Sequence, residues 1–183
     1  MDGSMTPTNI MIPAWVDGTL TPVEKLAAHQ RGLRHLAVSV FVMRHGSILI
    51  QQRALCKYHT PGLWANTCCT HPAWDEDPTD CAHRRVNEEL GITGLNLLHR
   101  GQVEYRAAVG PDMIEHEVVE VYLAEAAEDM AMAPNPEEVM AIRWITPQDL
   151  AAEIAQTPEA FTPWLRIYLD QHADMILGQP LEI

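Results

Sequence analysis

Two glutamates and three histidines have the types and spacing to hold a divalent metal ion. Glu115 and Glu117 are two residues apart, so in a strand both side chains point to the same face. Two carboxylates on one face of an otherwise apolar strand are costly to bury without a cation. With His29, His35 and His71 they form a mixed nitrogen and oxygen set, which suits zinc, manganese, magnesium or iron in an octahedral site. The chain has nine histidines, and for most of them a surface or satisfied core position is the plainer interpretation.

A pair of adjacent cysteines precedes His71 in the sequence. If this segment is extended, Cys69 and His71 face the same side and Cys68 faces the other side. Cys69 is then the thiol on the side of the metal, while Cys68 points into the core, where a free cysteine behaves as a small hydrophobe. On spacing alone, a structural role for both cysteines stays the plainer alternative.

Charged residues one helical turn apart mark a second candidate site. Arg85 is followed four residues later by Glu89, and Arg84 by Glu88, so Arg85 lies between the two glutamates around the helix. One interpretation is a set of surface ion pairs of small energetic value. The other is an anion and magnesium site, in which Glu89 holds Mg²⁺ against phosphate oxygens and Arg85 binds those oxygens directly.

The overall charge limits the class of partner. A formal net charge of −13 argues against nucleic acid, because a phosphate backbone needs a basic surface. An anionic small substrate is still compatible if positive charge gathers locally. The two lysines, Lys25 and Lys57, lie in polar segments, and Arg53, Arg84 and Arg85 add to them. Each of these cations taken alone is equally consistent with a solvated surface charge.

The elements that must position these residues are marked by their caps and turns. Asp77 is a good N-cap, Pro78 suits the first helical position and Gly91 is a C-cap, so a helix is predicted from Pro78 to Leu90. Strands are predicted at 10–16, 36–43, 47–52, 103–108, 115–123 and 141–145, with helical segments at 25–30, 147–154 and 163–177. Turns are expected at 17–18, 45–46 and 110–111, and a loop at 53–62. This order predicts an α+β fold.

Length and composition are those of one globular domain. We expect a single domain at 10–178, an N-terminal extension at 1–9 and a C-terminal tail at 179–183. The second methionine, at position 5, indicates that residues 1–4 were added to the natural start. The N-terminus lacks the pattern of a signal peptide, and no apolar run is long enough to span a membrane. The four cysteines do not form a disulfide pattern, so a cytoplasmic location is predicted.

The predicted helix resembles the Nudix signature. In that signature a glycine and a glutamate precede, at fixed spacing, a run of Arg-Glu-apolar-any-Glu-Glu-any-Gly-apolar. The residues that fall on the pattern are Glu76, Arg84, Val86, Glu88, Glu89, Gly91 and Ile92. Thr70 stands where the glycine is expected, and Arg85 where the first glutamate is expected. Because the glutamates of Nudix hydrolases bind the metals that activate water, the charge reversal at Arg85 argues against pyrophosphate hydrolysis.

Most of the chain is similar to the type I isopentenyl-diphosphate isomerases, a family of Nudix fold that does not hydrolyse its substrate. The motifs are EKLAAH, LRHLA, QQRAL-KY--PG-W-N--C-HP, RRV--ELG, EYRA, EHEV and TPW, in consistent order from Glu24 to Trp164. The resemblance implies a Nudix-like α/β/α sandwich with a mixed central sheet. Two features depart from the family pattern: the interval between His29 and His35 is a residue shorter, and Cys68 adds a second cysteine.

The resemblance also implies a role for each matching residue. A buried divalent metal, Mn²⁺, Zn²⁺ or Mg²⁺, is bound by His29, His35, His71, Glu115 and Glu117. Cys69 and Glu117 are the acid/base pair on opposite sides of an alkene, with Tyr105 beside Glu117 and Trp164 over the reacting carbons. The diphosphate is bound by Lys25, Arg53, Lys57 and Arg85, with Mg²⁺ held by Glu89.

The expected activity is therefore the interconversion of isopentenyl and dimethylallyl diphosphate in isoprenoid biosynthesis. The expected partner is a small diphosphate, with no nucleic acid and no membrane, and the protein is expected to be a monomer or a homodimer. One alternative is a Nudix hydrolase of an organic or nucleoside diphosphate. Another is a non-catalytic Nudix-like module that senses a diphosphate, although such a sensor has no use for Cys69, Glu117 and Tyr105 together.

Overall fold

The computed structural model describes residues 10–178 and 181, so the predicted extension at 1–9 and most of the predicted tail lie outside the described residues. The strands are β1 (Met11–Val16), β2 (Thr19–Glu24), β3 (His35–Arg44), β4 (Ser47–Arg53), β5 (Trp64–Ala65), β6 (Cys68–Thr70), β7 (Leu98–Gly110), β8 (Met113–Glu125) and β9 (Val139–Ile145). The α-helices are α1 (Lys25–Arg31), α2 (Pro78–Leu90), α3 (Pro147–Gln156), α4 (Pro163–Gln171) and α5 (Ala173–Leu177), and a short 3-10 helix spans Pro158–Ala160.

Strand β3 is the centre of one mixed sheet. It runs parallel to β8 over residues 35–43 and antiparallel to β6, while β8 continues into an antiparallel pair with β7. In the predicted hairpin, β3 and β4 pair at only two positions, beside the His45-Gly46 turn. The rest of β4 pairs with β5 and β9. Beyond the two hairpin pairs, β3 pairs with β6 instead of β4, at residues 38–40.

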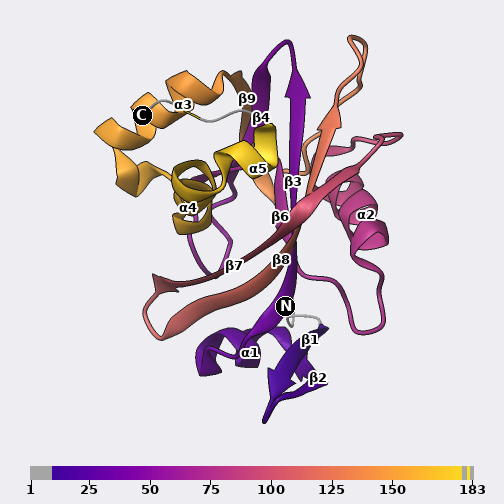
Figure 1. The fold of residues 1–183 in the computed structure, drawn as a ribbon, viewed down its shortest axis with the longest axis vertical. Coiled ribbons are helices and arrows are strands. Elements are labelled where there is room, and N and C mark those ends of the chain that lie inside the picture. The colour runs from indigo at the N-terminus through magenta and orange to yellow at the C-terminus, as the bar shows by residue number, and fades with distance from the viewer. Residues whose placement is uncertain (1–9, 179–180, 182–183) are drawn as a thin grey trace, which may run out of the picture.

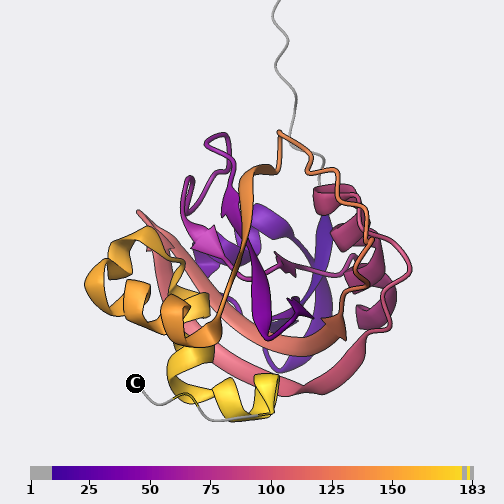
Figure 2. The same cartoon turned by 90° about the horizontal axis from the view of Figure 1, so that it is seen from above.

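The sheet lies between two helical layers, as the resemblance implies. Ala37, Phe41 and Met43 of β3 pack on the side of α4 and α5, and Val38 and Val40 pack on the side of α2. This alternation is the period of a strand that is buried on both faces. Figure 1 shows α2 on one side of the sheet and α3 to α5 on the other, and Figure 2 shows the same two layers from above.

The predicted helix of the Nudix-like segment has the expected ends. Asp77 is the N-cap and accepts a hydrogen bond from the Thr79 N–H, and Pro78 occupies the first turn. Gly91 closes the helix in the left-handed conformation with a φ of 65°, which glycine adopts at little cost. An added Cβ at Gly91 would lie 2.8 Å from Ala133 Cβ, so packing also requires glycine there.

Two predictions about elements need correction. Residues 19–24, for which the sequence predicts no strand, form strand β2, which pairs with β1 through the two-residue turn at Asp17-Gly18. The predicted helix at 163–177 is broken at His172, which has a φ of −132°. The break lets Ile176 enter the core and lets Arg100 donate hydrogen bonds to the carbonyl groups of Met175 and Ile176.

Helix α1 and strands β1 and β2 lie together at one end of the sheet (Figure 1). Their apolar residues Ile12, Ala14, Val23 and Ala28 form a small separate core. Gly32 ends α1 in the left-handed conformation with a φ of 60°, and the chain enters β3 directly at His35. No helix among the described residues is both long and apolar enough to cross a membrane.

Candidate active site

The sheet places three functional side chains in neighbouring register positions. Tyr105 of β7 pairs with Glu117 of β8, and Glu117 pairs in turn with His35 of β3. Opposite residues on neighbouring strands project to the same face. Cys69 of β6 is paired with Ser39 of β3, which lies four residues beyond His35 and therefore on the same face. The alternation of Cys68 and Cys69 is confirmed: Cys68 is buried with the residues under α2, and Cys69 packs on the opposite side.

Four of the five predicted metal ligands converge on one point. Glu115 Oε2 lies 3.1 Å from His29 Nε2, 3.3 Å from His35 Nε2 and 3.7 Å from His71 Nε2. One ligand atom from each of these four buried residues lies within 4.8 Å of all the others. The shorter interval between His29 and His35 does not prevent this, because Gly32 turns the chain sharply and the two imidazole centroids are 4.8 Å apart.

The hydrogen bonds of the imidazole rings leave nitrogen lone pairs for a cation. His29 Nδ1 donates to the Lys25 carbonyl oxygen at 2.6 Å, and His35 Nδ1 donates to the Leu33 carbonyl oxygen at 2.7 Å. A carbonyl oxygen only accepts, so in the neutral form of each ring, which is the form that binds a metal, the lone pair is on Nε2, which faces Glu115. These two Nε2 atoms and Glu115 Oε2 are buried without a hydrogen-bond partner among the described residues. The donor set therefore fits a divalent metal ion.

Glu117, the fifth predicted ligand, lies between this cluster and Tyr105. Its Oε1 is 2.8 Å from His71 Nε2, and its Oε2 accepts a hydrogen bond from the Tyr105 hydroxyl at 2.7 Å. Burial raises the pKa of Tyr105 well above its usual value, so the phenol stays protonated as the donor. Burial, together with the Lys25 ammonium, lowers the pKa of His71 and favours the neutral imidazole that a metal needs.

Cys69 is held as a protonated thiol beside the same cavity. Its Sγ donates to Asn66 Oδ1 at 2.8 Å and lies 3.1 Å from Ser39 Oγ. Burial raises the pKa of the Cys69 thiol, and the negative charge of Glu117 adds to the effect. A thiol in this condition can donate a proton but is a poor nucleophile at neutral pH. Ser39 Oγ is in turn 2.8 Å from the hydroxyl of Tyr168, a buried residue that sequence analysis missed.

One cavity brings together residues of both candidate sites, although His29 and His35 are not part of its lining. Its lining includes the deep residues Cys69, His71, Tyr105, Glu115, Glu117 and Trp164, and the charged residues Lys25, Arg53, Lys57, Arg85 and Glu89. A larger groove of about 530 Å³ lies between α3, α4 and the end of β7. None of the predicted site residues lines that groove, so the chemistry lies in the smaller polar cavity.

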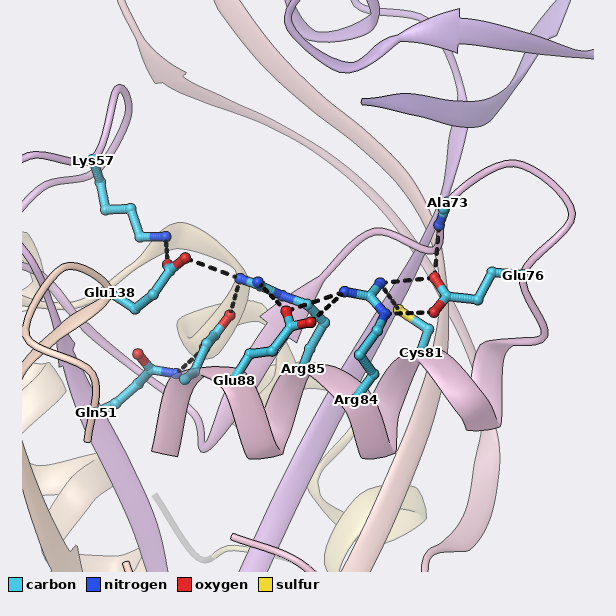
Figure 3. Close-up of polar contacts among 10 residues, drawn as sticks. Gln51, Lys57, Ala73, Glu76, Cys81, Arg84, Arg85, Glu88 and Glu138 are labelled. Atoms are coloured by element: carbon cyan, nitrogen blue, oxygen red, sulfur yellow. Dashed lines mark hydrogen bonds and ion pairs between the residues drawn. The ribbon is translucent and has the colours of Figure 1, made fainter. Parts of the chain in front are cut away.

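Two of the cations at the mouth of the cavity are already paired with carboxylates (Figure 3). Arg85 donates to Glu88 and to Glu89 at 2.7 Å each, and it also lies 3.4 Å from Glu138. Lys57 pairs with the other oxygen of Glu138. The predicted pairing of Arg85 with both helix glutamates is confirmed, whereas Glu138 was not predicted because it lies in a long irregular segment between β8 and β9.

The positive charges are also close enough to perturb one another. Burial lowers the pKa of Lys25, and burial lowers the pKa of Lys57 to about 8, with the nearby Arg53, Lys25 and Arg85 cations adding to the effect. Arg53 lies 5.4 Å above the Trp164 ring. Because these cations repel one another, they lower the pKa values of the two lysines, and the cluster is suited to binding a multiply charged anion.

Arg84, next to Arg85 on α2, faces away from this cavity (Figure 3). It donates to both carboxylate oxygens of Glu76, at 2.6 and 2.8 Å, and to Glu88. Its side chain is 40% exposed, against 20% for Arg85. The two neighbouring arginines of the Nudix-like helix therefore have different surroundings, one in an exposed ion-pair ladder and one at the cavity.

His59 is the main cavity residue that sequence analysis missed. It belongs to the loop between β4 and β5, is 6% exposed, and its Nε2 lies 3.2 Å from Glu115 Oε1. Burial lowers the pKa of His59 to about 2, so its ring is neutral. No periodicity marks a loop residue; the only available signal was its position between Lys57 and the Pro61-Gly62 turn.

Comparisons with known proteins agree with this geometry. A model of the NUDIX domain matches residues 33–165. An isopentenyl-diphosphate Delta-isomerase from Dinoroseobacter shibae is 62% identical over 92% of this chain and 96% of its own length. The protein of the same name from Cereibacter sphaeroides is 64% identical, also over 92% of this chain and 96% of its own length.

Solved structures with lower sequence identity to this chain share its fold. A protein from Deinococcus radiodurans superposes with a TM-score of 0.68 at 19% identity, covering 85% of this chain and 94% of its own. A MutT NUDIX hydrolase from Burkholderia pseudomallei has a TM-score of 0.59 at 26% identity, covering 76% of this chain and 98% of its own. These likenesses establish the Nudix architecture, with helices on both sides of a mixed sheet.

Proposed function

The chain belongs to the Nudix family and, within it, to the isopentenyl-diphosphate Delta-isomerases, and on this premise we propose that its polar cavity interconverts isopentenyl and dimethylallyl diphosphate. The observation that carries the proposal is the shared lining: Cys69 and Glu117 border the same cavity as the four cations Lys25, Arg53, Lys57 and Arg85. This arrangement supports an acid/base pair deep in the cavity and an anion site at its mouth.

The reaction itself requires these residue types. One proton is added to the terminal carbon of an unactivated alkene, and another is removed from the methylene beside it, so the double bond moves by one position and no atom is lost. Cys69 and Glu117 serve as the proton donor and acceptor, and they exchange these roles in the reverse direction. The hydroxyl of Tyr105, 2.7 Å from Glu117 Oε2, orients the carboxyl group and stabilises its ionised form.

The intermediate of such a reaction has the character of a tertiary carbocation. The buried indole of Trp164 offers a π face to it, and such contacts are worth about 2 kcal/mol when water is excluded. The site residues around this cation are buried: Glu117, His71 and Trp164 are each at most 9% exposed. Water that would trap the cation as an alcohol is therefore kept out.

The metal set is proposed to be His29, His35, His71, Glu115 and Glu117, holding Mn²⁺, Zn²⁺ or Mg²⁺. A bound divalent cation would offset the cost of burying two carboxylates and tune the proton affinity of Glu117. The unpartnered Nε2 atoms of His29 and His35 support this set.

The diphosphate is proposed to bind at the mouth of the cavity, through Lys25, Arg53, Lys57 and Arg85. Glu89 would hold Mg²⁺ that arrives with the diphosphate; its Oε2 is fixed by a hydrogen bond from Gln51 at 2.8 Å. The diphosphate is then a handle whose binding energy positions the alkene between Cys69 and Glu117.

A Nudix hydrolase of a diphosphate is the rival function. Arg85 occupies the signature position of a metal-binding glutamate and instead pairs with Glu88 and Glu89, which supports a site that binds the diphosphate without cleaving it. Incubation of the pure protein with isopentenyl diphosphate and Mg²⁺, followed by product analysis, tests both. Dimethylallyl diphosphate without released phosphate is expected; released phosphate would point to the hydrolase, and an unchanged substrate to a sensing module.

The isotope pattern of the product tests the proton transfers. In D₂O, deuterium is expected in the new methyl group of dimethylallyl diphosphate and, through the reverse reaction, at the methylene beside the double bond of recovered isopentenyl diphosphate, because both positions exchange protons with the acid/base pair. Turnover without incorporation of solvent deuterium would rule out this mechanism.

A further inference from the structure

His59 contacts the metal cluster from the loop that follows Arg53 and carries Lys57, two of the proposed diphosphate ligands. Its Nε2 lies 3.2 Å from Glu115 Oε1, and its ring stacks on that of His29 with centroids 5.6 Å apart. On the other side, the ring meets Trp164 edge-on at 6.0 Å. His59 is therefore a buried neighbour of both the metal cluster and the aromatic face of the cavity.

The two carboxylate oxygens of Glu115 have different surroundings. Oε2 faces the Nε2 atoms of His29, His35 and His71, at 3.1 to 3.7 Å. Oε1 faces only His59 among the histidines that surround this carboxylate. His59 is not one of the four residues whose ligand atoms lie within 4.8 Å of one another. Its polar contact with the cluster is the one between its Nε2 and Glu115 Oε1.

The loop holds the His59 ring with Nε2 facing Glu115 and Nδ1 facing Thr60. Thr60 Oγ1 lies 3.0 Å from His59 Nδ1, and a hydroxyl that donates to Nδ1 leaves the ring proton on Nε2, facing Glu115. Thr60 itself has a φ of 46°, a strained value for a β-branched residue. Arg53 stabilises this conformation by donating to the carbonyl oxygens of His59 and Thr60 at 3.2 Å each.

We propose that His59 is a positioning residue of the metal site: its Nε2–H donates to Glu115 Oε1 and turns Oε2 toward the three histidines. The inference rests on the proposed function for the identity of the metal site, and it adds a link between that site and the loop of Arg53 and Lys57. Because Arg53 holds the His59 carbonyl, the segment that contacts the diphosphate also fixes a ligand of the metal. Partners of this kind typically change metal affinity by about 10- to 100-fold.

A matched pair of variants tests the role of the Nε2–H group. In His59→Gln the side-chain amide reaches the place of Nε2 and can still donate to Glu115. In His59→Asn the amide lies near the place of Nδ1, beside Thr60, and is too short to reach Glu115. Mn²⁺ is titrated into each metal-free protein, and free Mn²⁺ is followed by electron paramagnetic resonance. We expect affinity to fall about 10- to 100-fold in His59→Asn and by less than about threefold in His59→Gln.

His45 supplies a matched control. It contacts Glu128 at 2.6 Å, but its side chain is 72% exposed and lies in the turn between β3 and β4. His45→Asn is expected to bind Mn²⁺ as the parent protein does. Thermal melting of the metal-free proteins checks that the His59 variants fold, which we expect because His59 lies in a loop.

The outcomes separate this inference from the proposed function. Equal Mn²⁺ affinity in the parent protein and both His59 variants, or an equal loss in both variants, would overturn the positioning role. Failure of the metal-loaded parent protein to isomerise isopentenyl diphosphate would overturn the proposed function instead, and the Mn²⁺ titrations would still report on His59.

Discussion

The deep and outer parts of the cavity hold charge in opposite ways. In the deep part, Glu115 and the imidazoles of His29 and His35 are buried, and atoms that point at one another lack hydrogen-bond partners among the described residues. In the outer part, Arg85 and Lys57 keep about a fifth of their side chains exposed and already contact carboxylates of the chain. The deep part is thus arranged around a cation, while two cations of the outer part, Arg85 and Lys57, already have carboxylate partners.

Because the two parts differ in this way, one cavity can hold a metal ion in its deep part and a diphosphate in its outer part. A metal in the deep part would meet three ligand atoms that have no hydrogen-bond partner among the described residues, His29 Nε2, His35 Nε2 and Glu115 Oε2, and would disrupt only the contact between His71 Nε2 and Glu117 Oε1. An arriving diphosphate must instead compete with Glu138 for Lys57 and Arg85. We therefore expect the deep metal to be a permanent component and the outer ions to exchange with each turnover. The predictions below test this contrast.

The largest effect is expected for the thiol of the deep part. Cys69→Ala removes one member of the acid/base pair and should lower kcat by about 10²- to 10⁴-fold. Cys68→Ala is the matched control, because Cys68 faces the core under α2, and it should retain most of the activity at some cost in stability. Steady-state kinetics of the two variants decides; loss of activity in Cys68→Ala alone would refute the assignment of the thiol.

Removal of the deep metal is expected to act on stability as well as on activity. A ligand present at about 100 times its Kd stabilises the folded state by about 2.7 kcal/mol, so stripping the protein with a chelator should lower the free energy of unfolding by that amount. Denaturant unfolding with and without added Mn²⁺ measures it. The same experiment on Glu115→Gln should show a much smaller response, and a full response would exclude Glu115 as a ligand.

A smaller effect is expected for the outer magnesium ligand. Glu89→Gln should raise the Mg²⁺ concentration for half-maximal activity by about tenfold, the size of one lost interaction with a charged group. Glu88→Gln is the control, since Glu88 is 43% exposed and does not line the cavity. An unchanged magnesium dependence in Glu89→Gln would contradict the proposed role of this carboxylate.

The outer part should also be the pH-sensitive part. Burial and neighbouring cations lower the pKa of Lys57 to about 8, so its ammonium is charged below that pH and neutral above it. Diphosphate binding favours the charged form; kcat/KM should therefore fall as pH rises through about 8, by at most tenfold per pH unit. Lys57→Arg should move the fall to higher pH. A fall that stays near pH 8 in Lys57→Arg would assign it to another group.

The smallest effect is expected outside the cavity. Arg84 lies in the exposed ladder with Glu76 and Glu88, and such surface pairs contribute about 0–1 kcal/mol. Arg84→Ala should therefore change kcat/KM by less than about threefold, whereas Arg85→Ala should raise KM by more. Kinetics of both variants under the same Mg²⁺ concentration compares the two neighbours. Equal effects would show that the ladder and the cavity act as one network.

Prediction from sequence worked where local rules decide the structure. The caps at Asp77 and Gly91 fixed the bounds of α2, and strand alternation placed Cys68 and Cys69 on opposite faces. It missed β2, because Pro22 is typical of a turn or loop and only an edge strand tolerates it. It missed the break at His172, because the packing of Ile176 and the donors of Arg100 come from distant parts of the chain.

The same distinction between local and non-local determinants applies to the residues of the candidate site. Residues on regular elements, such as Glu115, Glu117 and Arg85, were found because their spacing shows which face they occupy. His59 and Glu138 were missed, because a loop has no period and their partners lie far away in sequence.

The sequence by itself determined the types of reactive groups and the faces they share on each element. Strand and helix periods follow from backbone geometry, which is local, so they can be read from spacing. Only the tertiary structure decided which faces meet: the parallel pairing of β3 with β8 sets His35 beside Glu117, and the loop after β4 brings His59 to Glu115. Those choices depend on non-local pairing and burial, which no window of residues contains.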